Sequence, residues 1–145
     1  MAKRIIRIVL EVLSLLILLG TIVFLAVYWK QIPEQVPTHF GFDGQATAWS
    51  GKGSVLLTPV LMAVLYVSLF FGKTMRFRSL GKETRVPVPE LMFPIIKLPL
   101  LAGIAYITVC IALARPLVSW CLGVLFGLAF LPLCIYAIII QAKMR

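Results

Sequence analysis

The sequence predicts an all-α fold: an integral membrane bundle of four transmembrane helices, with an ordered extracytoplasmic loop between the first two. The chain of 145 residues is 61% hydrophobic and only 13% charged, whereas soluble proteins average about 45–50% and about 25%. It also contains four apolar runs close to the ~20 residues that a helix needs to cross a bilayer. Residues 1–145 are therefore expected to form a single membrane domain. This composition argues against a soluble enzyme, a nucleic-acid-binding domain or a disordered regulator.

The first apolar run, residues 5–29, is expected to be an uncleaved transmembrane helix. Lys3, Arg4 and Arg7 give it a basic start, as in a signal peptide. Its apolar part is longer than the roughly 7–15 residues of a signal peptide, and no clear A-x-A cleavage site follows. A helix that stays in the membrane therefore explains this run better.

Three further helices are expected over residues 55–71, 98–114 and 117–140. Pro59 falls in the first turns of the second helix, where proline does least harm. Pro132 lies inside the fourth helix and predicts a kink there. Because only Arg115 and Pro116 separate the last two runs, these helices are expected to form a tight helical hairpin.

The net charge of +9 reflects membrane topology rather than a nucleic-acid partner. Lys and Arg collect on the cytoplasmic side of membrane proteins, and eleven of the 14 basic residues lie at the two termini or in the loop 72–97. These eleven are Lys3, Arg4, Arg7, Lys73, Arg76, Arg78, Lys82, Arg85, Lys97, Lys143 and Arg145. The pattern predicts a multi-pass plasma membrane protein with both termini and the basic loop 72–97 in the cytoplasm, and the loop 30–53 outside. The basic loop either sets this topology alone or also docks to anionic lipid head groups.

The cysteines and glycines of the last two runs carry little functional signal. Cys110, Cys121 and Cys134 lack CxxC spacing and are expected to be small packing residues, with no metal and no cofactor. Gly123 and Gly127 form a GxxxG pattern. Because this pattern lets two helices approach closely, it leaves a homo-oligomer open as a partner.

The loop 30–53 differs in composition from everything around it. It holds the only His, the only Asp, two Pro, four Gly and a Trp. Proline fixes φ and glycine supplies positive φ, so the loop is expected to be a specific, ordered turn structure.

His39 is the residue of this loop with the widest chemistry. An imidazole titrates near neutral pH and can sense pH, carry a proton or bind a metal, and Asp43 and Glu34 lie nearby in the sequence. The structural alternative is that His39 and Lys52 hydrogen-bond loop carbonyls and fix the turn. The chain shows no HExxH motif, nucleophile elbow or phosphate-binding loop, so we do not expect an enzyme.

One motif in the loop resembles a known family. The pattern Ile-Pro-x-x-Val-Pro-x-His-Phe-x-x-x-Gly, followed by Trp-x-x-Lys, is similar to that of the bacterial domain of unknown function 1648, and it follows a first membrane helix as it does there. The resemblance covers roughly residues 5–72. The residues that carry the motif are Pro33, Pro37, His39, Phe40, Gly44, Trp49 and Lys52. The sequence departs from the family pattern at Thr47, where an Asp is common.

The resemblance implies a function as well as a fold. The same domain forms the N-terminal part of the longer immunity proteins against the sporulation-delaying toxin. It therefore implies a non-enzymatic bacterial membrane protein that confers toxin immunity or recognises a ligand. The partners expected are the lipid bilayer and, at the outer face, a peptide or small-molecule ligand.

Glu11 is the acidic residue inside the first apolar run. Carboxylates within membrane spans are costly and often functional, which leaves a small proton-coupled transporter using Glu11 as an alternative function. Arg7 lies four residues earlier on the same helix face, so an ion pair of Glu11 with Arg7 near the interface is the structural expectation. An accessory subunit of a larger membrane complex is a third possibility.

Overall fold

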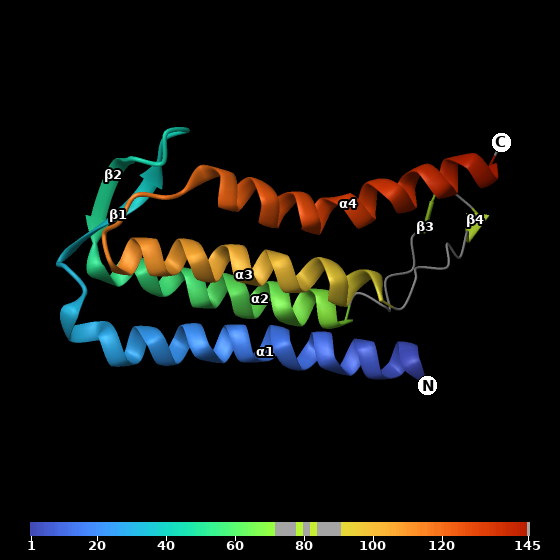
Figure 1. Cartoon of the computed structure of the whole chain (residues 1–145), viewed down its shortest axis with the longest axis horizontal. Helices are drawn as coiled ribbons and strands as arrows, with labels where there is room; N and C mark the ends of the chain where they lie inside the picture. The colour runs from blue at the N-terminus through green and yellow to red at the C-terminus, as the bar shows by residue number, and fades with distance from the viewer. Residues whose placement is uncertain (72–77, 80–81, 84–90, 145) are drawn as a thin grey trace.

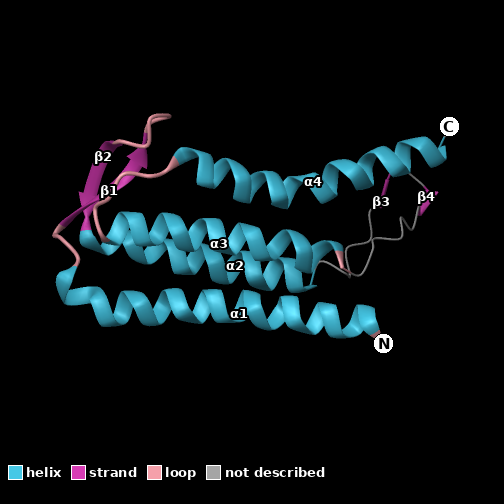
Figure 2. Cartoon of the chain, viewed as in Figure 1, coloured by secondary structure: helices cyan, strands magenta, loops and turns pink. Residues whose placement is uncertain are grey.

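The computed structural model describes residues 1–71, 78–79, 82–83 and 91–144, and four long helices dominate this part of the chain (Figures 1 and 2). They are α1 (Ala2–Tyr28), α2 (Leu57–Phe71), α3 (Met92–Ala112) and α4 (Ser119–Met144). Each is apolar and long enough to cross a membrane, α2 together with the helical turn before it. The predicted all-α bundle of four membrane-spanning helices is confirmed, with a small two-stranded sheet added between α1 and α2.

The third helix begins six residues earlier than expected, at Met92 instead of residue 98. Pro94 lies in its first turn, where the missing N–H of proline leaves no helical hydrogen bond unmade. The expected basic loop 72–97 is therefore too long, and Lys97 belongs to α3. Lys73, Arg76 and Arg85 of that loop lie outside the described residues. The short strands β3 (Arg78–Ser79) and β4 (Lys82–Glu83) pair with each other.

Helix α3 is the centre of the bundle. Half of its apolar window is buried, against 6% for that of α4. Leu101 and Ile104 of α3 pack with Leu18 of α1 and Met62 of α2, while Ile96 packs with Ala129 of α4. The remaining faces of α1, α2 and α4 are apolar and exposed, as expected of surfaces that face lipid.

The loop between α1 and α2 is a β-hairpin. Strand β1 (Gln35–Phe40) pairs antiparallel with β2 (Ala46–Gly51), with register shifts on either side of His39. The single 3-10 turns η1 (Trp29–Gln31) and η2 (Lys52–Leu56) join the hairpin to the two helices. Buried Val36 of β1 packs with Leu25 of α1 and Ile111 of α3, so the hairpin closes one end of the bundle. The sequence predicted an ordered loop but not its strands.

The tip of the hairpin is hydrogen-bonded to the connection between α3 and α4. The main-chain N–H of Gly44 donates to the Gly41 carbonyl (2.9 Å), and the Gly44 carbonyl accepts from the N–H of Leu117 (2.8 Å). The hydroxyl of Ser119 donates to the Phe42 carbonyl (3.0 Å). The expected tight helical hairpin at Arg115 and Pro116 is thus a longer connection, 113–118, held in place by the β-hairpin.

The end of α3 has the hydrogen bonds of a Schellman motif. The N–H of Ala114 donates to the Ile111 carbonyl (3.1 Å) and that of Arg115 to the Cys110 carbonyl (2.9 Å). Ala114 has a φ of +48°, the left-handed conformation in which glycine is usual. The chain therefore makes this turn with a residue that strains it.

We expect Gly44→Ala to destabilise the protein by more than about 1 kcal/mol. Gly44 has a φ of +78°, and a Cβ there would lie 1.9 Å from the Leu117 carbonyl oxygen. Thermal unfolding in detergent measures the change. Gly51→Ala is the matched control, because a Cβ at Gly51 would meet nothing within 4 Å. Equal melting temperatures for the two variants would contradict the docking of the tip.

Ala114→Gly should instead stabilise the protein, by about 0.5 kcal/mol. A left-handed alanine costs about 1–2 kcal/mol, which exceeds the about 0.5–1 kcal/mol of chain entropy that glycine loses on folding. The same substitution at exposed Ala137, inside α4, should lower stability. Comparison of the two melting temperatures tests this sign reversal, and a fall for both variants would refute it.

Candidate functional site

The motif residues of the hairpin divide into a buried set and an exposed set. Pro37 and Gly44 are buried, and Phe40 is half-buried against the cluster at the end of the bundle. Pro33 is exposed and directly follows Ile32, which is buried in that cluster, at the entry to β1. The buried residues and Pro33 shape the hairpin and fix it to the helices.

Lys52 stabilises the hairpin differently from the sequence expectation. Its ammonium group lies over the Trp29 ring, 5.1 Å from the ring centroid, and its main-chain N–H donates to the Glu34 carbonyl (2.8 Å). A side-chain bond to a loop carbonyl was expected. A cation over an indole ring contributes about 0.5–1 kcal/mol at an exposed site. Lys52 thereby links η2 to the end of α1.

His39 and Trp49 form the exposed set, together with Phe42 at the tip. His39 is exposed, Trp49 retains 54% of its surface, and Phe42 is fully exposed. In the ladder Pro37 pairs with Trp49, and His39 pairs with the neighbouring Ala48. Within the described residues no hydrogen bond uses the His39 imidazole. The hairpin therefore holds an imidazole and two aromatic rings away from the bundle, where a ligand can reach them.

Asp43 shapes the turn rather than forming a site with His39. Its Oδ1 atom accepts a hydrogen bond from the Gln45 main-chain N–H (3.1 Å), which is an Asx turn. Among the described residues no group of three or more His, Cys, Asp or Glu side chains is placed to hold a metal ion. The polar chemistry of the hairpin is thus limited to isolated donors and acceptors beside aromatic rings.

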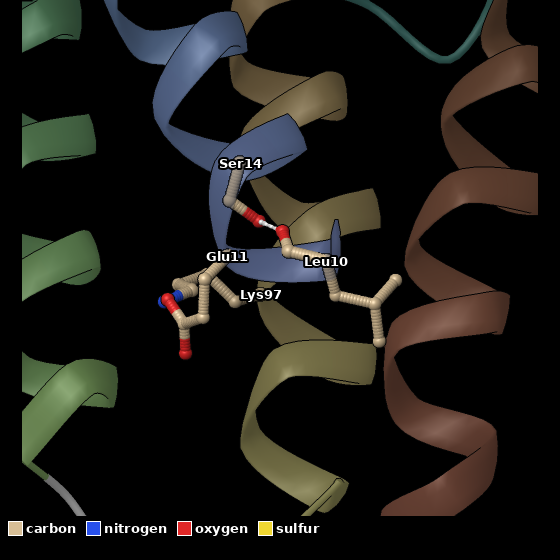
Figure 3. A network of polar contacts seen from close by, with 4 residues as sticks. All are labelled: Leu10, Glu11, Ser14 and Lys97. Atoms are coloured by element: carbon tan, nitrogen blue, oxygen red, sulfur yellow. Dashed lines mark hydrogen bonds and ion pairs between the residues drawn. The ribbon is translucent and has the colours of Figure 1, made fainter. Parts of the chain in front are cut away.

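The second candidate site is an ion pair inside the bundle. Glu11 of α1 pairs with Lys97 of α3, whose side chain is completely buried (Figure 3). The expected pairing of Glu11 with Arg7 is wrong. The i–4 argument considers one helix alone, and the fully buried ammonium group of Lys97 on the neighbouring helix needs the carboxylate more than half-buried Arg7 does.

Aromatic rings of α2 close this ion pair from the side. The Lys97 ammonium lies 4.1 Å from the centroid of the Tyr66 ring and 5.6 Å from that of Phe70. Three helices thus meet at one charged side chain. The sequence signal that would have found it is a lone lysine in an otherwise apolar stretch that begins at Met92.

The glycines and cysteines of α4 lie mostly away from the helix contacts. A Cβ at Gly123 or Gly127 would meet nothing within 4 Å, whereas at Gly103 of α3 it would come within 3.8 Å of the Phe126 ring. Gly103 therefore faces α4, whereas the GxxxG pattern contacts no other helix among the described residues. Cys110 is buried, Cys121 is half-buried and Cys134 is exposed, and all three are free thiols.

Comparison with known proteins found one similarity, over the segment that contains the hairpin. No curated protein and no solved structure matched the chain. Residues 16–63 match the model of a family described as a domain of unknown function, DUF1648. The matched segment starts within α1, contains the whole hairpin with its seven motif residues, and ends within α2. This segment of the chain is therefore similar to the domain of unknown function 1648.

Proposed function

We propose that this protein is a non-enzymatic membrane protein that recognises a ligand through the exposed side chains of its hairpin. One observation carries the proposal: His39, Trp49 and Phe42 are exposed on a hairpin that the rest of the motif holds rigidly. An exposed tryptophan does not stabilise a surface that only faces water. It does stabilise a complex, because aromatic side chains contribute most to the binding energy of interfaces. Recognition also needs a pre-organised surface, and the docked hairpin supplies one.

The charge distribution supports an outward position for the hairpin. The two termini lie together at the opposite end of the bundle (Figure 1), and α1 begins there with Lys3, Arg4 and Arg7. The hairpin end and its connections hold Lys30, Lys52 and Arg115. By the positive-inside rule this distribution supports cytoplasmic termini and an extracytoplasmic hairpin. The plasma membrane of a bacterium is part of the same proposal and rests on the resemblance.

A peptide is the ligand class that suits this surface best. Exposed indole and phenyl rings bind apolar side chains, and an imidazole and the free main-chain groups of a two-stranded sheet provide hydrogen bonds. The resemblance to toxin-immunity proteins points the same way. We propose immunity against a peptide toxin as the specific form of this recognition.

The test separates recognition from stability. In cells that produce the chain and are challenged with the sporulation-delaying toxin, Trp49→Ala and His39→Ala should each reduce protection about tenfold or more, equivalent to about 1.4 kcal/mol of binding. Membrane abundance and melting temperature should not change, because both side chains are exposed. Ser50→Ala, on the same strand and equally exposed, is the matched control.

Two results would count against the proposal. If wild-type chain gives no protection, the toxin-immunity form is wrong. If Trp49→Ala and His39→Ala lose protection only in proportion to a lower melting temperature, the two residues stabilise the hairpin and do not recognise a ligand.

The Glu11–Lys97 pair supports a second candidate function, proton-coupled transport. A carboxylate held within membrane-spanning helices, beside a cation and two aromatic rings, is in the setting in which transporters exchange protons. In this alternative, Glu11 releases its proton on one side of the membrane and takes one up on the other.

Replacement of both residues of the pair by uncharged ones distinguishes transport from a structural role. Glu11→Gln alone should cost about 3–5 kcal/mol, because it leaves the buried Lys97 ammonium unpaired. The double variant Glu11→Gln with Lys97→Met should recover most of that loss. In liposomes with an imposed pH gradient, wild-type chain should then move the lipophilic cation ethidium, and the folded double variant should not. Equal movement by both would rule out a proton-carrying role for Glu11, and no movement by either would leave the pair as structural.

A further inference from the structure

An apolar cavity lies between α1 and α4, on the far side of the bundle from the ion pair. Helices α1 and α4 both pack against α3. The cavity, of about 580 Å³, is lined by α1, α3 and α4. Its lining includes Leu10, Leu13 and Ile17 of α1, Leu98 of α3, and Leu125 and Leu128 of α4. In Figure 3 the Leu10 side chain points toward α4, while Glu11 and Lys97 point toward α2.

The size and position of the cavity suit a lipid chain. Its volume falls within the roughly 300–1,000 Å³ of small-molecule sites, and every residue that lines it is apolar. All of these residues belong to membrane-spanning helices. The cavity therefore opens toward hydrocarbon, where an acyl chain can enter without loss of water.

Two basic residues extend the cavity's wall toward the N-terminal end of α1. Lys3 lies seven residues before Leu10, a helical spacing for one face, and Arg7 lies three residues before Leu10 and four before Glu11, between the cavity side and the ion-pair side of α1. Within the described residues neither forms an ion pair, since Glu11 is taken by Lys97. The apolar stripe of α1 thus ends in two cations near the membrane surface, whereas Arg4 lies on the other side of the helix.

We propose that this cavity binds one anionic phospholipid. An acyl chain fills the space between Leu10, Leu98 and Leu128, and the phosphate group pairs with Lys3 and Arg7. The apolar slot suits the acyl chain of this lipid, and the unpaired cations suit its phosphate group. Free phosphate would not use the slot, and a neutral lipid would not use the cations. The site is separate from the hairpin, so its test is independent of the recognition proposed above.

The experiment compares two lipids with identical acyl chains on the purified full-length chain in detergent. Native mass spectrometry should show one phosphatidylglycerol bound at least tenfold more tightly than phosphatidylcholine. The double variant Lys3→Gln with Arg7→Gln should remove most of this preference, because each basic residue near a membrane surface contributes to binding anionic lipid. Arg4→Gln, a control that removes one positive charge from the same helix end, should change it less than twofold.

Variants that fill the cavity test the position of the acyl chain. Leu128→Trp should weaken the binding of both lipids by about tenfold, and Ala102→Phe, in the cavity wall of α3, provides a second variant if the first does not fold. Equal binding of the two lipids, or an equal effect of Arg4→Gln and the double variant, would overturn the proposal. So would a dimer that forms through this face and is abolished by Leu128→Trp, since a second copy would then be the occupant.

Discussion

The buried ammonium group of Lys97 is the constraint on which the arrangement of the helices depends. A charge with no exposed surface requires a partner, and Glu11 meets that need only if α1 has one rotation and one height against α3. The rings of Tyr66 and Phe70 then fix α2 on the same side. Apolar contacts between membrane helices are nearly interchangeable with lipid contacts, so they specify such a register weakly. A single ion pair therefore specifies the register of α1 against α3, which the apolar contacts alone do not specify.

At the other end of the bundle, one main-chain hydrogen bond and one side-chain hydrogen bond have the corresponding role. The bond between Leu117 and Gly44 and the bond from Ser119 to Phe42 join the hairpin to the start of α4, which is otherwise the least buried helix. Val36 of β1, on the buried side of the hairpin, packs on α1 and α3. The hairpin is thus a structural element of the bundle, and its exposed face is held as firmly as the helices are.

The sequence predicted the parts of the fold that depend on composition and local periodicity. Four apolar runs predicted four helices, and the prolines and glycines of 30–53 predicted an ordered loop. The strands were missed although Asp43-Gly44 is a hairpin turn signal, because that pair lies within a five-residue connection, 41–45, and the ladder contains register shifts around His39. Lys97 was assigned to a loop because a charge usually ends an apolar run, yet its partner lies 86 residues away in the sequence. Spacing along one helix predicted Arg7 as the partner of Glu11. It could not reveal that Lys97, on a neighbouring helix, competes for the same carboxylate.

Helix α1 connects the sites at the two ends of the molecule. Glu11 faces α2 and α3, Leu10 faces the lipid cavity, and Leu25 lies under the hairpin. Because an α-helix is stiff along its length, a rotation of α1 that separated Glu11 from Lys97 would also reshape the cavity wall and shift the support of Val36. The position of the hairpin that carries His39 and Trp49 therefore depends on the same two helices, α1 and α3, that the Glu11–Lys97 pair joins. The segment 16–63, which matches the family model, is for this reason not sufficient to form the surface, which needs α3 as well.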